Sequence, residues 1–549
     1  MATTCRGASA AAVRITWPSS ESPATSCKTF GRRDFRRAPS PAAKMAMVTG
    51  MDKAMTPRHN SRLARTFPPN YKFLGKADAI PARNRMAPTR PDGKDMRRFF
   101  GTDGIRGRAG AFPLQPEALS VIGATLTSVF FLRARRAPRF VIGGDTRESS
   151  PWIAAALAQG IAQAGGTVSC AGVIPTPGVA YLTRAEGFDA GIVVSASHNP
   201  YHDNGIKFFL ASGEKRDDDL ETAIEVALDA LPPAPPTADA PDAPPLWEDP
   251  THALSYLEFL TQRIAADLDL SRWRLALDCA NGAAAPYANI MLQALGAQTC
   301  VTGATPTGRN INDQRGTTHI RHLAEFARAT DAQLGIAFDG DADRCLFVDE
   351  QGEVVDGDAI LYAMALDADA RSELSPRCVV TTVMSNMGLE VALRERGIEL
   401  IRTPVGDRAV LAAMLERGAL LGGEQSGHII FARQSLAGDG LITALNVLRM
   451  LTERNLSLRE AVRGLARFPQ TLINVPVREK RPFETLPGLA ATVRDVEAQL
   501  AGRGRLLLRY SGTENLARVM LEAANGIDIG ALAAQVAAAI ARDLGNGRP

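Results

Sequence analysis

The sequence has few cysteines, no CxxC pair and no long apolar segment. Seven cysteines in 549 residues argue against a disulfide-stapled fold or a cysteine-based zinc site and favour a reduced, cytoplasmic protein. No apolar run approaches the roughly 20 residues that a membrane span needs, so we expect no membrane partner. An apolar content of 45% and a charged content of 22% are typical of a soluble globular protein. At about 150 residues per domain, the length predicts three or four domains.

The net charge of +3 is also small, but it is the sum of two unlike segments. Residues 1–95 carry 18 Lys and Arg against 6 Asp and Glu (+12), which leaves 44 basic and 53 acidic residues (−9) for the rest. The basic segment has no sustained helical or strand period, so we expect it to be disordered. It can be read as a nucleic-acid-binding arm, as a transit peptide, or as a segment outside the working protein, which would then start at Met96. We favour the third interpretation and expect no nucleic-acid partner.

A strand–turn–helix–strand pattern occurs three times in the rest of the chain. The copies begin at Phe140 (FVIGGDTRESS), Leu275 (LALDCANG) and Cys378 (CVVTTVMSN). Such units with short turns predict parallel sheets flanked by helices, and their spacing predicts three similar α/β domains. Eight prolines in residues 231–250 predict an extended connector with a boundary near 240.

After about residue 470 the pattern changes to short strands and two helices, which predicts a smaller α+β domain. The predicted fold class is therefore α/β, with four domains after a disordered N-terminal extension, and the chemistry is expected on loops where domains meet. The predicted ranges are 1–95 for the extension, 96–245 for domain I, 246–365 for domain II, 366–470 for domain III and 471–549 for domain IV.

The first loop with unusual chemistry is SASHNP, which follows the apolar strand GIVV. Pro200 prevents the strand from continuing, so Ser197 and His198 are expected on a turn. A hydroxyl flanked by His and Asn is a candidate nucleophile or phosphate carrier. Read alone, the motif is equally consistent with a polar turn. No acid stands nearby at the spacing of a Ser-His-Asp triad, which argues against a serine hydrolase.

The second loop contains three alternating acids, Asp339, Asp341 and Asp343, between the apolar runs LGIAF and CLFV. In an extended stretch these carboxylates point the same way, within reach of one cation. Ligands that are all oxygen favour Mg²⁺ over zinc and leave room for a phosphate oxygen. A solvated acidic turn is the alternative. An EF-hand fails because Arg344 occupies the position where that loop needs glycine.

The third loop, LLGGEQSGHIIF, has Glu424, Ser426 and His428 in alternation between two apolar runs. Such a row suits hydrogen bonding to vicinal sugar hydroxyls. An N-cap or a surface turn explains the pattern about as well.

The fourth loop follows the strand LLLR and reads RYSGTEN. An arginine with two hydroxyls and free backbone amides makes a cradle for a phosphate dianion. A capping turn is the alternative. The cradle residues are Arg509, Ser511, Gly512 and Thr513.

Taken in order, GTDGIRG, SASHNP, DGDADR, GEQSGH and RYSGTEN resemble the α-D-phosphohexomutase superfamily over residues 96–549. Within it, FFGTDGIRG, VMSNMGLE and GDGLITAL are most similar to the bacterial phosphoglucosamine mutases. Those isomerases interconvert glucosamine 6-phosphate and glucosamine 1-phosphate for UDP-N-acetylglucosamine synthesis, through a phosphoserine and a 1,6-bisphosphate. The resemblance implies a heart-shaped four-domain fold and a small sugar phosphate as substrate, and it leaves a homo-oligomer open.

Two alternatives remain. A phosphomannomutase or phosphoglucomutase of the same superfamily is the nearer one, although Gln425 in the sugar loop favours the glucosamine enzyme. A non-catalytic nucleic-acid-binding protein is the remote one.

The resemblance also implies a role for each site residue. Ser197 carries the phosphoryl group, and Lys207 accepts a proton because neighbouring cations lower its pKa. One departure is Asn515, which stands where these enzymes commonly have proline. The implied residues are Ser197, Arg106, Lys207, Arg344 and His198 for catalysis; Glu424, Ser426, His428, Arg509, Ser511, Gly512 and Thr513 for substrate; and Ser197, Asp339, Asp341 and Asp343 for Mg²⁺.

Overall fold

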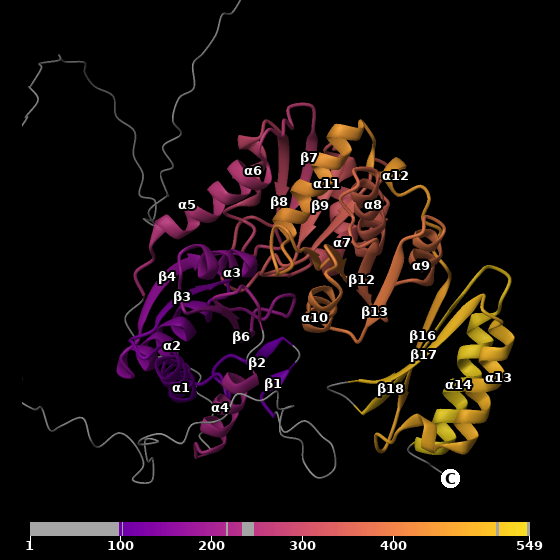
Figure 1. The fold of residues 1–549 in the computed structure, drawn as a ribbon, viewed down its shortest axis with the longest axis horizontal. Coiled ribbons are helices and arrows are strands. Elements are labelled where there is room, and N and C mark those ends of the chain that lie inside the picture. The colour runs from indigo at the N-terminus through magenta and orange to yellow at the C-terminus, as the bar shows by residue number, and fades with distance from the viewer. Residues whose placement is uncertain (1–97, 102, 216–217, 233–245, 512–514, 546–549) are drawn as a thin grey trace, which may run out of the picture. The chain divides into compact units, whose positions relative to one another are not determined.

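The computed structural model describes residues 98–101, 103–215, 218–232, 246–511 and 515–545 (Figure 1). The predictions for residues 1–95 and for Gly512 and Thr513 lie outside the described residues. The described chain forms four separate sheets, each with its own helices. The prediction of three α/β domains and a smaller α+β domain is confirmed.

Domain I is a six-stranded sheet covered by helices on both faces. In β3, Phe140 and Ile142 pack with α1 and α2, whereas Val141 packs with α3 on the other face. After the exposed Arg139 the strand is apolar and buried because both of its faces are covered. The strand order is β1-β2-β6-β5-β3-β4. The elements are β1 (Phe100–Gly101), β2 (Gly104–Arg108), α1 (Pro116–Ala134), β3 (Arg139–Gly144), α2 (Ser150–Gln163), β4 (Thr167–Val173), α3 (Thr176–Ala185), β5 (Ala190–Val194), β6 (Asp203–Leu210) and α4 (Asp218–Asp229).

Domain II is a five-stranded sheet of order β11-β10-β9-β7-β8. Its first helix starts after the proline-rich connector and is capped by the Asp249 carboxylate, which accepts a bond from the Thr251 amide. The elements are α5 (Pro250–Glu258), the π-helical turn η1 (Phe259–Ile264), β7 (Arg274–Asp278), α6 (Ala288–Ala294), β8 (Gln298–Thr302), the 3₁₀ turn η2 (Thr317–His319), α7 (Ile320–Ala329), β9 (Leu334–Phe338), β10 (Cys345–Val348) and β11 (Val354–Val355).

Domain III is a four-stranded sheet of order β13-β12-β14-β15. The boundary expected after residue 365 lies inside α8, a continuous helix that is capped at its start by Asp356. The elements are α8 (Gly357–Ala370), β12 (Cys378–Thr382), α9 (Met387–Arg394), β13 (Glu399–Thr403), α10 (Asp407–Arg417), β14 (Leu421–Gly423), β15 (Ile429–Phe431), α11 (Gly440–Arg454) and α12 (Leu458–Ala461).

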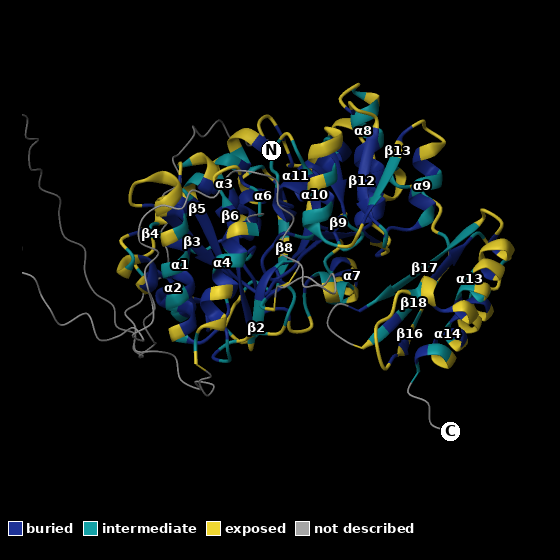
Figure 2. Ribbon diagram, turned by 60° about the horizontal axis from the view of Figure 1, so that its bottom comes forward, coloured by how far each residue is buried: buried dark blue, intermediate teal, exposed yellow. Residues whose placement is uncertain are grey.

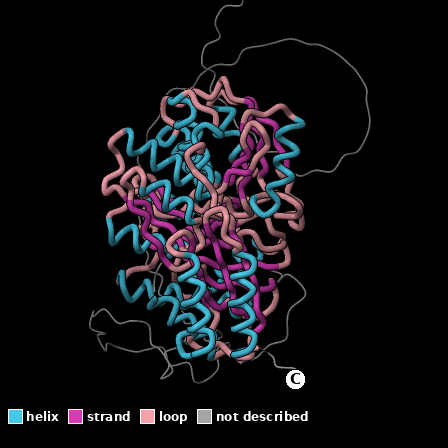
Figure 3. The backbone as a smooth tube through the Cα atoms, turned by 90° about the vertical axis from the view of Figure 1, so that its right-hand side faces the viewer, coloured by secondary structure: helices cyan, strands magenta, loops and turns pink. Residues whose placement is uncertain are grey.

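Domain IV is a three-stranded antiparallel sheet of order β16-β18-β17. Helices α13 and α14 lie side by side across one face of it (Figure 3). Leu489, Val519 and Val536 belong to a core of its own. The elements are β16 (Gln470–Pro476), the 3₁₀ turn η3 (Phe483–Thr485), α13 (Pro487–Leu500), β17 (Gly504–Tyr510), β18 (Leu516–Ala523) and α14 (Ile529–Leu544).

The first three sheets are mixed, whereas the sequence predicted parallel ones. In each, a central strand has parallel neighbours on both sides: β3 between β4 and β5, β7 between β8 and β9, and β12 between β13 and β14. The next strand then returns antiparallel, as β6, β10 and β15. The prediction failed there because the connecting loops are too short for a crossover helix and can only reverse the chain.

Domains I, II and III share one hydrophobic core. Val179 of α3, Ile336 of β9 and Leu445 of α11 belong to the same buried cluster. The central strands of these domains are correspondingly buried along most of their length (Figure 2). The three domains therefore hold their loops in fixed relation to one another.

One described helix, α1, meets the length and composition of a membrane span. Its Leu119, Ile122 and Leu126 are fully buried in the core of domain I. This is the environment of a core helix.

Candidate active site

The four chemically unusual loops occupy corresponding places in the four domains. SASHNP connects β5 to β6, DGDADR connects β9 to β10, EQSGH connects β14 to β15, and the segment after Tyr510 connects β17 to β18. Each loop is the turn of an antiparallel pair. In the first three domains it follows the carboxyl end of a strand in the parallel part of the sheet, where open α/β sheets place their binding sites.

Ser197 is buried at the tip of its loop, with 1% of its surface exposed. Its φ is +52°, a left-handed conformation that is costly for a serine. Its amide donates to Ser195 Oγ at 2.9 Å, and its own Oγ donates to Asp339 Oδ2 at 2.6 Å. The predicted phosphate carrier of domain I therefore touches the predicted metal loop of domain II.

Two side chains that the sequence did not single out clamp this loop. Arg147 donates to the carbonyl oxygens of Ser197 (3.0 Å) and Asn199 (2.6 Å), and it is fully buried against the carboxylate of Asp145. Asn312 of domain II donates to the same two carbonyls at 2.9 and 3.0 Å. These four bonds hold the strained loop in place. The sequence predicted a turn for the segment DTRESS and assigned no role to Arg147. Nothing in this segment indicates the distant carbonyl oxygens to which Arg147 donates.

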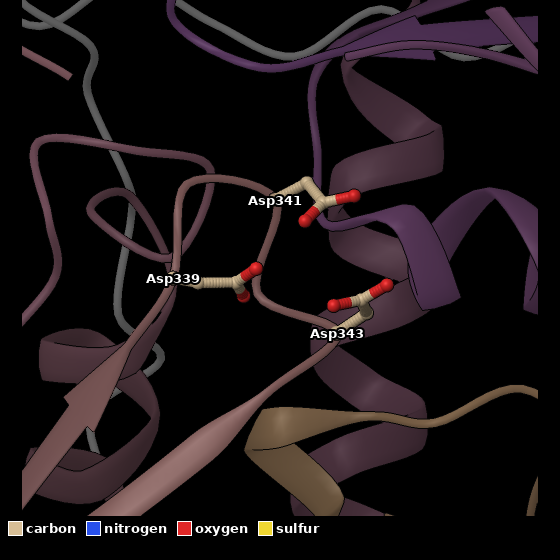
Figure 4. A group of neighbouring side chains, drawn as sticks. All are labelled: Asp339, Asp341 and Asp343. Carbon is tan, nitrogen blue, oxygen red and sulfur yellow. The ribbon is translucent and has the colours of Figure 1, made fainter. Parts of the chain in front are cut away.

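The carboxylates of Asp339, Asp341 and Asp343 converge, as predicted (Figure 4). One oxygen of each lies within 4.8 Å of the others, and all three residues are buried. The route differs from the expected extended stretch, because the chain curls through a turn in which Ala342 has a φ of +56°. Curvature of the loop, not strand alternation, brings the acids together.

The residues present fit a cation. Burial, Asp343 and Asp341 raise the pKa of Asp339 well above its usual range. Buried oxygens of Asp341 and Asp343 (Oδ1 in each) have no hydrogen-bond partner among the described residues. A divalent cation would relieve both the repulsion and the missing bonds, and the oxygen-only donor set suits a hard ion.

Lys207 lies in this cluster, but the expectation of a lowered pKa is wrong. Burial lowers the pKa of Lys207, but Asp103, Asp341 and Asp343 outweigh burial and raise it above the usual value. Its Nζ lies 2.8 Å from Asp341, 2.9 Å from Asp103 and 3.6 Å from Asp343. Three carboxylates therefore surround the Lys207 ammonium group.

His198 and two arginines surround Ser197. His198 Nδ1 lies 3.4 Å from Ser197 Oγ and 3.3 Å from a guanidinium nitrogen of Arg344. Burial, Arg344 and Arg106 lower the pKa of His198 to about 4, so the imidazole is neutral at pH 7. The Nε atoms of Arg106 and Arg344 are buried without hydrogen-bond partners among the described residues. Arg344 Nε lies 3.8 Å from Asp343 Oδ1, and the Arg106 guanidinium forms an ion pair with Asp103.

The predicted sugar loop lies against the start of α8. A Cβ on Gly357 would come within 2.1 Å of the Glu424 carbonyl oxygen, and the Gly357 amide donates to Gln425 O at 3.0 Å. His428 is 3% exposed, and neither its ring nitrogens nor Ser426 Oγ have a hydrogen-bond partner among the described residues. The loop thus presents polar groups that have no hydrogen-bond partner among the described residues. These groups lie on a turn, whereas the sequence predicted an extended row.

Arg509 lies apart from this cluster, at the end of β17. With Arg402, Thr403 and Leu507 it lines an open cavity of about 400 Å³. Burial and Arg518 lower the pKa of Arg509, and burial and Arg505 lower that of Arg402. Each lining arginine therefore has a further cation beside it, and an anion bound there would offset this repulsion. Ser511 is buried, and its carbonyl accepts a bond from Lys480 at 2.6 Å.

Models of one protein family match the chain in four consecutive segments. They are described as phosphoglucomutase/phosphomannomutase alpha/beta/alpha domains I, II and III and C-terminal domain, and they match residues 97–232, 255–352, 356–468 and 472–539. The matched segments follow the four sheets of the structure. This family is metal-dependent, in keeping with the buried acidic triad.

Curated relatives resemble the chain over almost their whole length. The phosphoglucosamine mutase of Koribacter versatilis is 46% identical over 463 residues, which cover 82% of this chain and 98% of that relative. The enzyme of the same name from Deinococcus radiodurans is 47% identical over 442 residues and covers 80% of this chain and 97% of its own.

Solved structures share the fold. A phosphoglucomutase/phosphomannomutase family protein from Burkholderia thailandensis superposes with a TM-score of 0.64 at 25% identity, covering 80% of this chain and 97% of its own. The N-acetylphosphoglucosamine mutase of Aspergillus fumigatus, in complex with GlcNAc-6P and magnesium, has a TM-score of 0.52 at 19% identity, covering 81% and 96%.

Proposed function

The chain belongs to the phosphoglucosamine mutase family, and from this membership and the site geometry we propose that it interconverts glucosamine 6-phosphate and glucosamine 1-phosphate. The observation that carries the proposal is the bond between Ser197 Oγ and Asp339 Oδ2. A buried serine hydroxyl bonded to a carboxylate of the proposed cation site supports the role of Ser197 as phosphoryl carrier.

Ser197 holds the phosphoryl group in the resting enzyme. The bond from phosphorus to Ser197 Oγ breaks as a bond from phosphorus to the free sugar hydroxyl oxygen forms, and the proton of that hydroxyl passes to the departing Ser197 Oγ. The resulting 1,6-bisphosphate turns over, and its other phosphoryl group returns to Ser197. The clamp by Arg147 and Asn312 supports this scheme because it fixes the backbone of the loop that carries Ser197.

Asp339, Asp341 and Asp343, with a phosphoserine oxygen, would hold Mg²⁺, which when bound offsets negative charge on the transferred group. Arg106, Arg344 and protonated Lys207 add positive charge around the same group. Phosphoryl transfer has a loose, highly charged transition state, so fixed cations contribute more than a strong base. We therefore assign Lys207 an electrostatic role.

The sugar and its second phosphate are held by the other two domains in this proposal. Glu424, Ser426 and His428 present hydrogen-bonding groups to the sugar hydroxyls. Arg509 and Ser511, with Gly512 and Thr513 of the same motif, bind the non-reacting phosphate. Burial and the positive charge of Arg518 lower the pKa of Arg509, which supports an anion-binding site beside Arg509.

Glucose or mannose phosphates are the competing substrates, since the superfamily also contains phosphoglucomutases and phosphomannomutases. The deciding experiment compares kcat/KM for glucosamine 1-phosphate and glucose 1-phosphate with the purified full-length protein and Mg²⁺. We expect at least about a tenfold preference for the glucosamine substrate, equal to 1.4 kcal/mol of transition-state binding. A preference of that size for glucose would overturn the assignment.

We place this reaction in the cytoplasm. The cysteines that the structure describes are all free thiols, which supports a reducing compartment.

A further inference from the structure

A row of five groups of alternating charge runs through the site, and the proposed reaction does not use all of it. Lys207 and Asp341 are buried, and the side chains of the other three are 9–20% exposed. The order is Asp407, Lys215, Asp103, Lys207, Asp341. Lys215 Nζ forms an ion pair with Asp407 and lies 3.1 Å from Asp103, whose other oxygen lies 2.9 Å from Lys207. Lys207 in turn lies 2.8 Å from Asp341.

This row of charged groups extends over three domains. Asp341 belongs to the metal loop of domain II, the next three groups belong to domain I, and Asp407 is the first residue of α10 in domain III. Asp407 also adjoins the sugar loop: one of its oxygens lies 3.9 Å from His428 Nε2, and the amide of Gly406 donates to Glu424 Oε1 at 3.2 Å. The two halves of the site are therefore joined by ion pairs.

Lys215 is the member that spans the junction of domains I and III. Its side chain is 9% exposed. Burial lowers the pKa of Lys215, but Asp103 and Asp407 outweigh burial and raise it, so the ammonium stays charged between two carboxylates. A buried charge that loses its partner is costly, so each pair strongly favours the closed arrangement.

A second contact closes the same junction. Arg408, next to Asp407, forms an ion pair with Glu221 of α4 in domain I. A small pocket of about 10 Å³, partly open to solvent, is lined by Lys215, Glu221 and Arg408 at this junction. The charged side chains of these two ion pairs are at most 22% exposed, so solvent screens them less than it screens a fully exposed pair.

We propose that Lys215 is a positioning residue whose ion pair with Asp407 holds the sugar loop of domain III against the phosphoserine loop of domain I and so keeps the bisphosphate in the site while it turns over. The proposal rests on the proposed mutase function. A mutase of this kind depends on such retention, because a bisphosphate that escapes takes the phosphoryl group with it and leaves Ser197 unphosphorylated. Lys215 acts through Asp407 and does not touch the reacting atoms.

The test measures escape of the intermediate. Full-length protein labelled with ³²P on Ser197 is mixed with glucosamine 6-phosphate and Mg²⁺, and free labelled 1,6-bisphosphate is quantified per molecule of product. Lys215→Met is expected to release about tenfold more bisphosphate than the wild type, which corresponds to a change of 1.4 kcal/mol in the partition between escape and return. Its steady-state rate should decay with time and recover when glucosamine 1,6-bisphosphate is added.

Two companion variants separate positioning from folding. Lys215→Arg keeps a cation in reach of Asp407 and should restore most of the retention. Asp407→Asn breaks the same pair from domain III and should match Lys215→Met, and the double variant should be no worse than either single one. The matched control is Arg309→Met, which breaks an exposed ion pair between Arg309 of domain II and Glu148 of domain I and should release no more than the wild type.

A second readout does not depend on activity. Hydrogen exchange of the amides in residues 211–215 and in the first turn of α10 should speed up in Lys215→Met and not in Arg309→Met. Wild-type retention in a folded Lys215→Met protein, with unchanged exchange at the junction, would overturn the inference. A wild-type protein that turns over no hexose phosphate, but whose junction loosens in Lys215→Met, would instead overturn the proposed function.

Discussion

The Oγ atom of Ser197 lies 2.6 Å from a carboxylate oxygen of Asp339, although 142 residues separate the two in the chain. The bond joins the phosphoserine loop of domain I to the metal loop of domain II. Both loops contain a residue with positive φ, Ser197 itself and Ala342. Strained turns on two domains that share one core therefore place the proposed phosphoryl carrier and the proposed cation site in contact.

Replacing Ser197 by alanine removes the phosphoryl carrier, so we expect mutase activity to fall by at least about a thousandfold. Intact mass should show the wild type in part heavier by one phosphate, and the variant should lack that species. The thermal unfolding temperature should change little, because the clamp on the loop binds backbone carbonyls. Near-normal activity in Ser197→Ala would refute the mechanism.

Asp343→Asn and Asp341→Asn should weaken the metal site in different ways. Asp343→Asn should chiefly raise the Mg²⁺ concentration needed for half-maximal activity, by about tenfold or more. Asp341→Asn should also lower activity at saturating Mg²⁺, because Asp341 pairs with Lys207 and accepts a bond from Thr176 at 2.7 Å. Titration of EDTA-treated protein with Mg²⁺ measures both effects. Identical behaviour of the two variants would contradict this division of roles.

Gly357→Ala should displace the sugar loop. The new methyl group would meet the Glu424 carbonyl at 2.1 Å, and backbone cannot yield as a flexible side chain does. We expect a loss of about 1–3 kcal/mol in the free energy of unfolding and a raised KM. Gly530→Ala is the control: it also lies at the start of a helix, but its nearest neighbour is 3.4 Å away, so alanine should be neutral or stabilising. Equal effects of the two substitutions would exclude the steric explanation.

Asp358→Asn should change how stability depends on pH. Burial and Asp356 raise the pKa of Asp358 to about 6. Between pH 4 and 6 the folded protein thus holds a proton that the unfolded chain releases, so wild-type stability falls as pH rises through this window, by up to about 3 kcal/mol. The Asp358→Asn variant has no carboxyl group at this position, so its stability should not fall in this way. Denaturant unfolding at pH 4.5 and 7.5 should show that the free energy of unfolding of the variant, relative to that of the wild type, is larger at the higher pH. The same difference between the two proteins at both pH values would contradict the assignment.

Much of this architecture was predictable from local patterns. The strands GIVV, LGIAF and CLFV and the helix LPGLAATVRDVEAQLA form where the apolar periodicity indicates, because burial of alternate or i, i+3 and i+4 residues is a local property. The mixed character of the sheets was not predictable in the same way. Strand direction depends on which neighbour a strand pairs with, and β6, β10 and β15 pair with the strand just before them.

The candidate site was likewise only partly predictable from the sequence. Motif residues such as Ser197, Asp339 and Glu424 stand out because polar groups interrupt apolar runs. Arg147, Asn312 and Lys215 carry no such signal, since each acts on a partner at least 50 residues away in the chain. Lys207 was identified but its pKa was predicted in the wrong direction, because the sequence indicates neighbouring cations and not the carboxylates that surround its ammonium group.

The sequence by itself determined the four-domain organisation, the motifs of the proposed site and the family to which the chain belongs. The tertiary structure decided which of those groups meet: Ser197 with Asp339, Lys207 with three carboxylates, and Asp407 with Lys215. The physical reason is that apolar periodicity and motif spacing are properties of neighbouring residues. Electrostatic balance at a buried site is instead a sum over charges that only the folded chain brings within a few ångströms of one another.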